Sequence, residues 1–150
     1  MNIFNAIKNA AYKLKINKIN SALLDSEILM SKVLKKNRMY LILYSHNELS
    51  EKQYINFQKL ISKRLKGKPV AYLTGSKFFW KYNFHLNSNV LIPRPDTELL
   101  IEQVLEIYKN KKKINFLEVG TGSGCIILSV LKEKESFFGT GVDLRKECIR

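Results

Sequence analysis

One stretch decides the fold of this chain: Leu117-Glu118-Val119-Gly120-Thr121-Gly122-Ser123-Gly124. The apolar run Ile114–Val119 leads into it, and Cys125–Leu131 follows it with the apolar content of a buried helix. A second strand-like run, Phe138–Asp143, comes next. Parallel strands need a crossover, so strand, glycine turn, helix and strand together predict a βαβ unit. The fold class is therefore α/β, and we expect the first strand to be buried on both faces of its sheet.

The three glycines of this stretch predict a small-molecule cradle. Gly120, Gly122 and Gly124 let the chain turn without Cβ atoms, and the turn offers backbone N–H groups at the start of a helix. The alternative is a tight connection without a ligand. Asp143 lies 19 residues after Gly124, at the end of the next predicted strand. An acid at that place can accept hydrogen bonds from both hydroxyls of a ribose, although it could also cap a helix.

The spacing of the glycines and the acid before them indicate which nucleoside would bind. The dinucleotide fingerprint is G-x-G-x-x-G, whereas this loop is G-x-G-x-G. Glu118 would repel a pyrophosphate but can help to hold an ammonium group, which S-adenosylmethionine carries. The alternative for Glu118 is a solvated carboxylate at a strand end. The candidate cofactor-binding residues are Glu118, Gly120, Thr121, Gly122, Ser123, Gly124 and Asp143, and no metal site is expected.

The first half of the chain has helical patterning. Apolar residues at intervals of three and four predict helices in residues 2–15 and 23–34, with a shorter one at 39–44. Ser50 and Gln53 form a capping box for a fourth helix, which should end before Gly67. Residues 1–66 are thus interpreted as a helical bundle with its lysines facing outward.

The sequence pattern changes after this bundle. Residues 77–92 are aromatic and β-branched, and they predict a β-hairpin that turns at residues 87–89, Asn-Ser-Asn. We expect residues 75–93 to be a linker between two domains. Asp96 or Thr97 should then cap a helix with its apolar face on Leu99, Leu100, Val104, Leu105 and Tyr108. The lysines at 111–113 should end this helix favourably against its dipole.

Charge and composition limit the possible functions. Residues 1–70 hold 14 basic and 4 acidic side chains, a net charge of +10, whereas residues 71–150 hold 12 and 9, a net charge of +3. We interpret the lysine excess as compositional drift, with a nucleic-acid-binding face as the alternative. We expect neither a membrane-spanning nor a signal segment, and the two cysteines are not close enough in sequence to suggest a metal site. A reducing cytoplasm and a monomer are expected.

Four motifs, in order, resemble one family. They are the strings at 67–75 (Gly-Lys-Pro-Val-Ala-Tyr-Leu-Thr-Gly), 79–80 (Phe-Trp), 91–100 (Leu-Ile-Pro-Arg-Pro-Asp-Thr-Glu-Leu-Leu) and 117–124. Together they resemble the peptide chain release factor glutamine N5-methyltransferases. The resemblance implies a helical substrate-docking domain (1–74), a hairpin linker (75–93) and the start of a Rossmann-like methyltransferase domain (94–150). It also implies S-adenosylmethionine-dependent methylation of the glutamine side-chain amide in the Gly-Gly-Gln motif of release factors, a step connected with translation termination.

The same resemblance implies an active-site loop, but one motif of the family is missing from this sequence. Arg94, Pro95, Asp96, Thr97 and Glu98 match a loop that lines the active site in the family. The catalytic signature Asn-Pro-Pro-Tyr is absent, because the prolines lie only at 69, 93 and 95. We therefore identify no catalytic residue, expect the 150 residues to be the front portion of a longer protein, and expect them alone to be inactive.

Two alternatives stay open: an RNA or DNA amino-group methyltransferase, and a non-catalytic module. The apolar residues of 114–150, among them Ile127, Val130 and Phe137, are expected to lack a covering partner.

Overall fold

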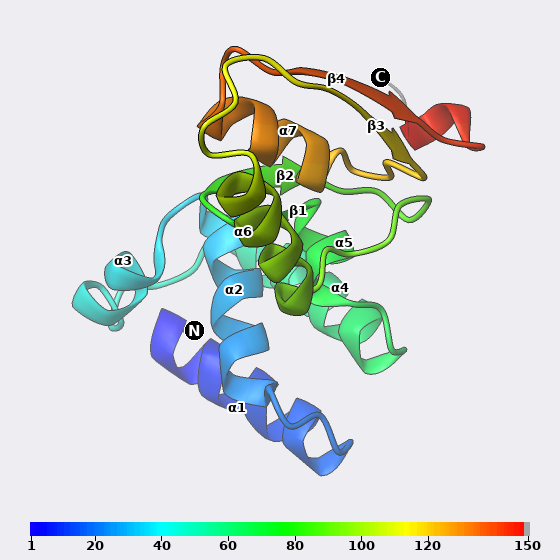
Figure 1. The fold of residues 1–150 in the computed structure, drawn as a ribbon. Helices are drawn as coiled ribbons and strands as arrows, with labels where there is room; N and C mark the ends of the chain where they lie inside the picture. The colour runs from blue at the N-terminus through cyan, green and yellow to red at the C-terminus, as the bar shows by residue number, and fades with distance from the viewer. Residues whose placement is uncertain (149–150) are drawn as a thin grey trace. The chain divides into compact units, whose positions relative to one another are not determined.

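The fold was analysed in a computed structural model that describes residues 1–148. The chain divides into two compact units, Met1–Thr74 and the part that begins at Gly75, and each is described by itself (Figure 1). None of the helices within residues 1–148 has the length and hydropathy needed to cross a membrane.

The first unit consists of five helices, in agreement with the helical patterning. They are α1 (Ile3–Ile16), α2 (Ala22–Leu34), α3 (Arg38–Leu43), α4 (Glu51–Leu65) and α5 (Val70–Thr74). The predicted capping box is present: the Ser50 hydroxyl accepts from the Gln53 N–H, and the Gln53 side chain accepts from the Ser50 N–H. Asn2 and Asn37 cap α1 and α3 in the same manner with their side-chain oxygens. These caps satisfy N–H groups that have no partner within a helix.

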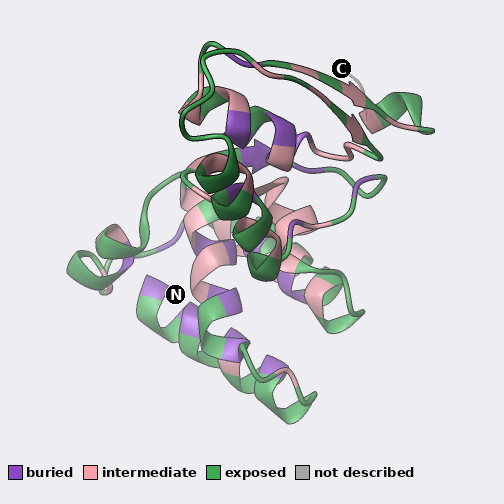
Figure 2. Cartoon of the chain, viewed as in Figure 1, coloured by how far each residue is buried: buried purple, intermediate pink, exposed green. Residues whose placement is uncertain are grey.

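The core of the first unit is apolar, with one ion pair inside it. Leu14, Leu29 and Phe57 are fully buried and belong to one hydrophobic cluster, visible as the buried faces of the helices in Figure 2. Asp25, 5% exposed, accepts a hydrogen bond of 2.7 Å from the Arg64 Nε–H. The pairing explains how a carboxylate is tolerated among apolar side chains, since an unpaired buried charge is costly.

The second unit contains a hairpin, two helices and a parallel strand pair. Its elements are β1 (Ser76–Phe79), β2 (Tyr82–His85), α6 (Glu98–Ile107), β3 (Asn115–Val119), α7 (Cys125–Glu133) and β4 (Phe138–Val142), with short 3₁₀ turns at Pro95–Thr97 and Lys146–Cys148. β1 and β2 are antiparallel, and β3 and β4 are parallel with α7 between them in sequence. The predicted α/β class and βαβ unit are confirmed.

The hairpin turns at a different place from the one predicted. Trp80 and Lys81 connect β1 to β2, and Trp80 has a left-handed φ of +57°. The Asn-Ser-Asn stretch forms a separate turn after the hairpin, in which the Asn89 N–H donates to Asn87 Oδ1 at 2.8 Å. Asparagine is a strong local turn former, but the Trp80 turn is held by distant carboxylates that no local pattern reveals.

Two expectations for α6 are wrong. Neither Asp96 nor Thr97 caps it with a side chain, because the chain enters α6 through the Pro95–Thr97 3₁₀ turn. The helix ends at Ile107, before the lysines at 111–113, so these cannot act on its last turn. Its buried face centres on Ile101, which is 0% exposed, while Leu99 and Leu100 face outward.

The β3–β4 sheet is covered on one face only, contrary to the expectation for β3. Phe116 and Glu118 point to the same face as Gly139 and Gly141, their register partners, and this face carries α7. On the other face Leu117 is 62% exposed and Val119 is 78% exposed. The period of two in a strand explains the alternation, and this sheet face has no cover among residues 1–148.

The second unit nevertheless has a core, which corrects the expectation that Ile127, Val130 and Phe137 lack a covering partner; for Val119 and Val142, which are exposed, the expectation is confirmed. Phe79 and Phe84 of the hairpin pack in one cluster with Ile101, Val130 and Phe137. Ile127 and Phe137 are only 6% and 4% exposed. Residues 75–93 thus supply part of this core, together with the helices that follow.

Candidate cofactor site

The glycine loop between β3 and α7 has a backbone that glycine makes possible. Gly120, Gly122 and Gly124 have φ values of +80°, +55° and +71°. Side chains other than glycine rarely adopt this left-handed region. The Gly120 and Thr121 N–H groups both donate to the carbonyl oxygen of Val142, at 2.8 and 3.0 Å. The end of β4 therefore fixes the start of the loop, and Gly124 leads directly into α7.

Glu118 lies under this loop at the start of α7. Its Oε2 accepts from the Thr121 hydroxyl at 2.7 Å and from the Ile127 N–H at 3.2 Å. Burial raises the pKa of the Glu118 carboxyl, and these two hydrogen bonds oppose the rise. A carboxylate beside the N-terminus of a helix is also favoured by the helix dipole. The arrangement places a half-buried negative charge where a cationic ligand group would be attracted.

Asp143 closes the other side of the loop, directly after β4. Its Oδ2 accepts from the Gly122 N–H at 2.8 Å, and its Oδ1 accepts from the Arg145 N–H at 3.0 Å. These bonds, that of Arg145 first, lower the pKa of Asp143, so the carboxylate is charged at neutral pH. The Cys148 thiol and the Leu144 N–H also interact with this carboxylate, which has about four lone-pair positions. A ligand hydroxyl at Asp143 would join or replace these donors.

A cavity of about 590 Å³ opens beside the loop. It is lined by Gly122 and Ser123 together with residues from β2, the turn after it, α7 and the final 3₁₀ turn, including Tyr82, His85, Asn87, Lys132 and Cys148. The volume falls within the usual range for small-molecule sites. The glycine loop thus borders a partly open hollow whose volume is sufficient for a small molecule.

The structure brings together only part of the residues predicted for the site. Glu118, the loop and Asp143 are joined by the hydrogen bonds above. Arg94, Pro95 and Asp96 are exposed, and the cavity lining within residues 1–148 includes none of the residues 94–98. Glu98 accepts from the Trp80 N–H at 2.7 Å and so stabilises the left-handed hairpin turn.

Several residues that position the site were missed by the sequence analysis. Arg145 Nη1–H donates to the Asn89 carbonyl at 3.1 Å, which ties the segment after Asp143 to the turn that borders the cavity. A Cβ at Gly139 would lie 2.9 Å from Ile127, and one at Gly141 would lie 2.9 Å from Thr121 Oγ1. These two glycines let α7 and the loop approach β4 closely. The sequence feature that could have indicated them is the Gly-Thr-Gly pattern within a strand, where glycine often marks a place at which another part of the chain packs closely against the backbone.

Comparison with known proteins gives a consistent result. Residues 5–75 match the family described as PrmC N-terminal domain. The release factor glutamine methyltransferase of Buchnera aphidicola is 39% identical over 149 residues, covering 99% of this chain and 53% of that protein. That of Shewanella oneidensis is 38% identical over 130 residues, covering 86% of this chain and 45% of the relative.

A protein named bifunctional methyltransferase from Rickettsia conorii is 35% identical over 161 residues, covering 90% of this chain and 31% of that protein. The chain thus spans about half the length, or less, of these curated relatives. The matches extend over both units and include the glycine loop region. Residues 5–75 of the chain therefore match the PrmC N-terminal domain, and most of its length is similar to proteins named release factor glutamine methyltransferase.

Proposed function

We propose that the protein methylates the side-chain amide of the glutamine in the Gly-Gly-Gln motif of peptide chain release factors, with S-adenosylmethionine as methyl donor. The observation that carries the proposal is that hydrogen bonds join Glu118 and Asp143 to the glycine loop, and that Gly122 and Ser123 of this loop line the cavity. The names of the relatives supply the substrate class. The assignment of an enzyme of translation termination in the cytoplasm rests on the same names.

The residues present fit this cofactor better than a dinucleotide. Glu118 lies beside the loop, where its carboxylate would repel a pyrophosphate, whereas an acid at the position of Asp143 suits the ribose of either ligand. S-adenosylmethionine has no phosphate. Its ammonium group is suited to the Glu118 carboxylate, and its ribose hydroxyls are suited to Asp143 as hydrogen-bond acceptor. When bound, it supplies an electrophilic methyl group on a sulfonium. The left-handed glycines allow the backbone to approach such a ligand without side chains between them.

The chain's own residues would bind and orient the cofactor. We assign Asp143 to the ribose hydroxyls, Glu118 to the ammonium side, and residues 120–124 to the backbone cradle. Arg94–Glu98 are assigned to a loop that borders the substrate. An amide nitrogen is a poor nucleophile, so its N–H groups must be gripped by acceptors that align it with the methyl group. These acceptors are not assigned to any of the residues present, because the Asn-Pro-Pro-Tyr motif does not occur in the sequence.

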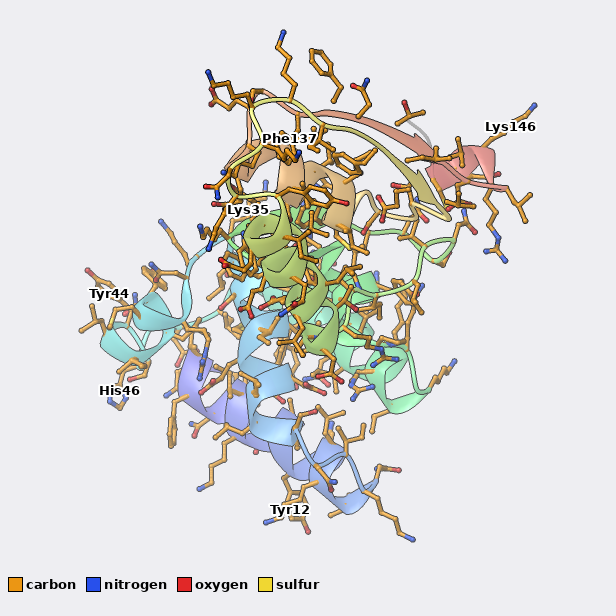
Figure 3. All side chains as sticks on the ribbon, viewed as in Figure 1. Tyr12, Lys35, Tyr44, His46, Phe137 and Lys146 are labelled. Carbon is orange, nitrogen blue, oxygen red and sulfur yellow. The ribbon has the colours of Figure 1, made fainter. Side chains whose placement is uncertain are left out.

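We further propose that the first unit docks the protein substrate in a groove between α1, α2 and α3. This groove has a volume of about 930 Å³, and its lining includes Phe4, Tyr12, Leu23 and Ile42, which are all more than half exposed. Tyr12 extends outward from α1 in Figure 3. Exposed apolar patches of this kind mark interaction sites.

The charge around the groove indicates the chemistry of its occupant. Lys8 and Lys15 line it from α1, and its only acid, Glu27, is paired with Arg38. The groove is therefore apolar with a positive rim. We expect a release factor segment that combines apolar and acidic side chains.

Two measurements test these proposals separately. Calorimetric titration of S-adenosylmethionine tests the cofactor site, and transfer of a labelled methyl group to a release factor by the whole protein tests the activity.

The docking groove is tested by release factor binding. Tyr12→Ala with Ile42→Ala should weaken release factor binding about tenfold or more and leave cofactor affinity unchanged. Ile55→Ala on α4, outside the groove, is the matched control. Equal release factor affinity in all variants would contradict the docking assignment.

A further inference from the structure

The lysines of the first unit are not used in its ion pairs, although Lys32 Nζ donates to the Thr74 carbonyl at 2.9 Å and Lys36 lies over the Tyr40 ring. The unit has four acids: Asp25 pairs with Arg64, Glu27 with Arg38, and Glu48 with the N-terminal ammonium group. The fourth acid, Glu51, stands in the first turn of α4. Within residues 1–74, as the structure describes them, none of the 12 lysines forms a salt bridge. The arginines and the N-terminus thus pair with three of the four acids, and the 12 lysines are exposed without an acidic partner within residues 1–74.

Four of these lysines form a row on α4. Lys52, Lys59, Lys63 and Lys66, which follows the last helical residue, are all exposed. At 3.6 residues per turn they fall within an arc of about 60° and extend over about 21 Å of the helix axis. They lie opposite Phe57 and Ile61, the buried residues of the helix. We call this row the α4 lysine face.

Neutral hydrogen-bond donors lie among these lysines. A shallow hollow of about 460 Å³ is lined by Tyr54, Ile55, Gln58, Lys59, Ser62 and Lys63. Five of these six side chains carry a donor, and Ile55 is the exception. A surface that combines aligned ammonium groups with hydroxyl and amide donors matches the oxygen atoms of phosphates.

We propose that the α4 lysine face binds the phosphodiester backbone of a nucleic acid duplex without reading its sequence. Lysine acts as a point charge suited to phosphate, whereas a carboxylate partner favours the bidentate fork of arginine. Arg64, the arginine of α4, is turned inward to Asp25. Ile55 is the one exposed apolar residue that lines the hollow, whereas a membrane-bound helix inserts a continuous apolar face. Non-specific phosphate contact is thus the chemistry that these side chains offer.

The experiment compares two variants of equal net charge. In the first, Lys52, Lys59, Lys63 and Lys66 are replaced by Gln. In the second, the replaced lysines are Lys13, Lys35, Lys112 and Lys146, which are exposed but scattered over the chain. Anisotropy of a labelled RNA duplex of about 16 base pairs, and of the DNA duplex of equal sequence, is followed from low to high KCl. Circular dichroism confirms that both variants remain folded.

The unmodified chain should bind with a slope of log K against log[KCl] between about −3 and −4, as expected for four neutralised phosphates. The α4 variant should lose more than tenfold in affinity and most of this slope, whereas the scattered variant should lose less than threefold. The duplex that binds more tightly identifies the source of the phosphates. Equal losses in both variants, binding to polyglutamate as tight as to the duplexes, or absence of binding at about 50 mM KCl would each overturn the proposal. None of these outcomes depends on methyl transfer.

Discussion

Asp143 joins the end of β4 to the glycine loop through a single carboxylate. Because Gly122 and Arg145 donate to it, replacement by Ala removes support for the loop as well as the acceptors for a ribose. We expect Asp143→Ala to lower S-adenosylmethionine affinity by about ten- to a hundredfold. Titration calorimetry measures this directly. Glu135→Ala, an exposed acid before β4, serves as the control, and unchanged affinity in Asp143→Ala would remove this residue from the site.

Glu118 should make the stability of the second unit depend on pH. Burial raises its pKa in the folded state, so the folded protein holds the proton more tightly than the unfolded one. The ionised carboxylate therefore costs stability once the pH rises above the unfolded value of about 4.3, and the cost is complete above the folded value. Glu118→Gln removes this cost while keeping an oxygen acceptor for Thr121.

The expected result is a Tm difference between Glu118→Gln and the unmodified chain that is small near pH 4 and grows in favour of the variant toward about pH 7. Thermal unfolding monitored at several pH values provides the test. The same variant should bind S-adenosylmethionine more weakly. Glu102→Gln, exposed on α6, should show a difference that does not change with pH. A pH-independent difference for Glu118→Gln would mean that its carboxylate carries no burial cost.

At the scale of elements, the C-terminus of α7 is connected to the hairpin by one acid. Glu133 accepts from Trp80 Nε1–H at 2.8 Å, Lys81 Nζ at 2.9 Å and the Tyr82 hydroxyl at 3.3 Å. An acid at a helix C-terminus is opposed by the helix dipole, and these three donors offset that cost. Lys81 first, and then Trp80, lower the pKa of Glu133. The hairpin turn and α7 are thus coupled over more than 50 residues of sequence.

Glu133→Ala should lower the Tm of the second unit by about 4–8 °C, the shift expected from the loss of roughly one net hydrogen bond in a domain of this size. Glu106→Ala is the matched control, because Glu106 also lies in the last turn of a helix and also pairs with a lysine, Lys109. This control should change Tm by less than half as much. Equal Tm shifts in Glu133→Ala and Glu106→Ala would mean that the effect comes from losing an acid at a helix end and not from losing the connection to the hairpin.

The sequence predicted elements whose signals are local. The apolar stripes and the capping box of Ser50 determined the helices of the first unit, and the glycine loop determined the βαβ unit. The hairpin turn at Trp80 could not be predicted, since its left-handed backbone depends on Glu98 and Glu133, which are distant in sequence. Glu118 and Asp143 were found because each adjoins a strand end. The Arg145 contact to Asn89 was missed, because nothing near either residue indicates the other.

At the scale of the whole molecule, the two units differ in how completely they are covered. The first has a buried core formed by four of its helices, whereas the β3–β4 sheet exposes Leu117, Val119 and Phe138 on one face. We expect amide hydrogen exchange to be at least about tenfold slower in α1 and α4 than in β3 and β4. Limited proteolysis should cut first near residues 108–113, before β3. Uniform protection along the chain would contradict this difference between the units.

Trp80, the only tryptophan in the chain, gives the second unit an optical signal of its own. Its indole is part-buried at the hairpin turn and donates to Glu133, so its emission depends on that contact and on the solvent beside it. Fluorescence excited at the tryptophan band consequently reports the unfolding of residues 75–148 and is silent for the helical bundle. Far-ultraviolet dichroism is dominated by the bundle. The two spectra recorded on one denaturant titration would separate the transitions of the two units without any label or added cysteine.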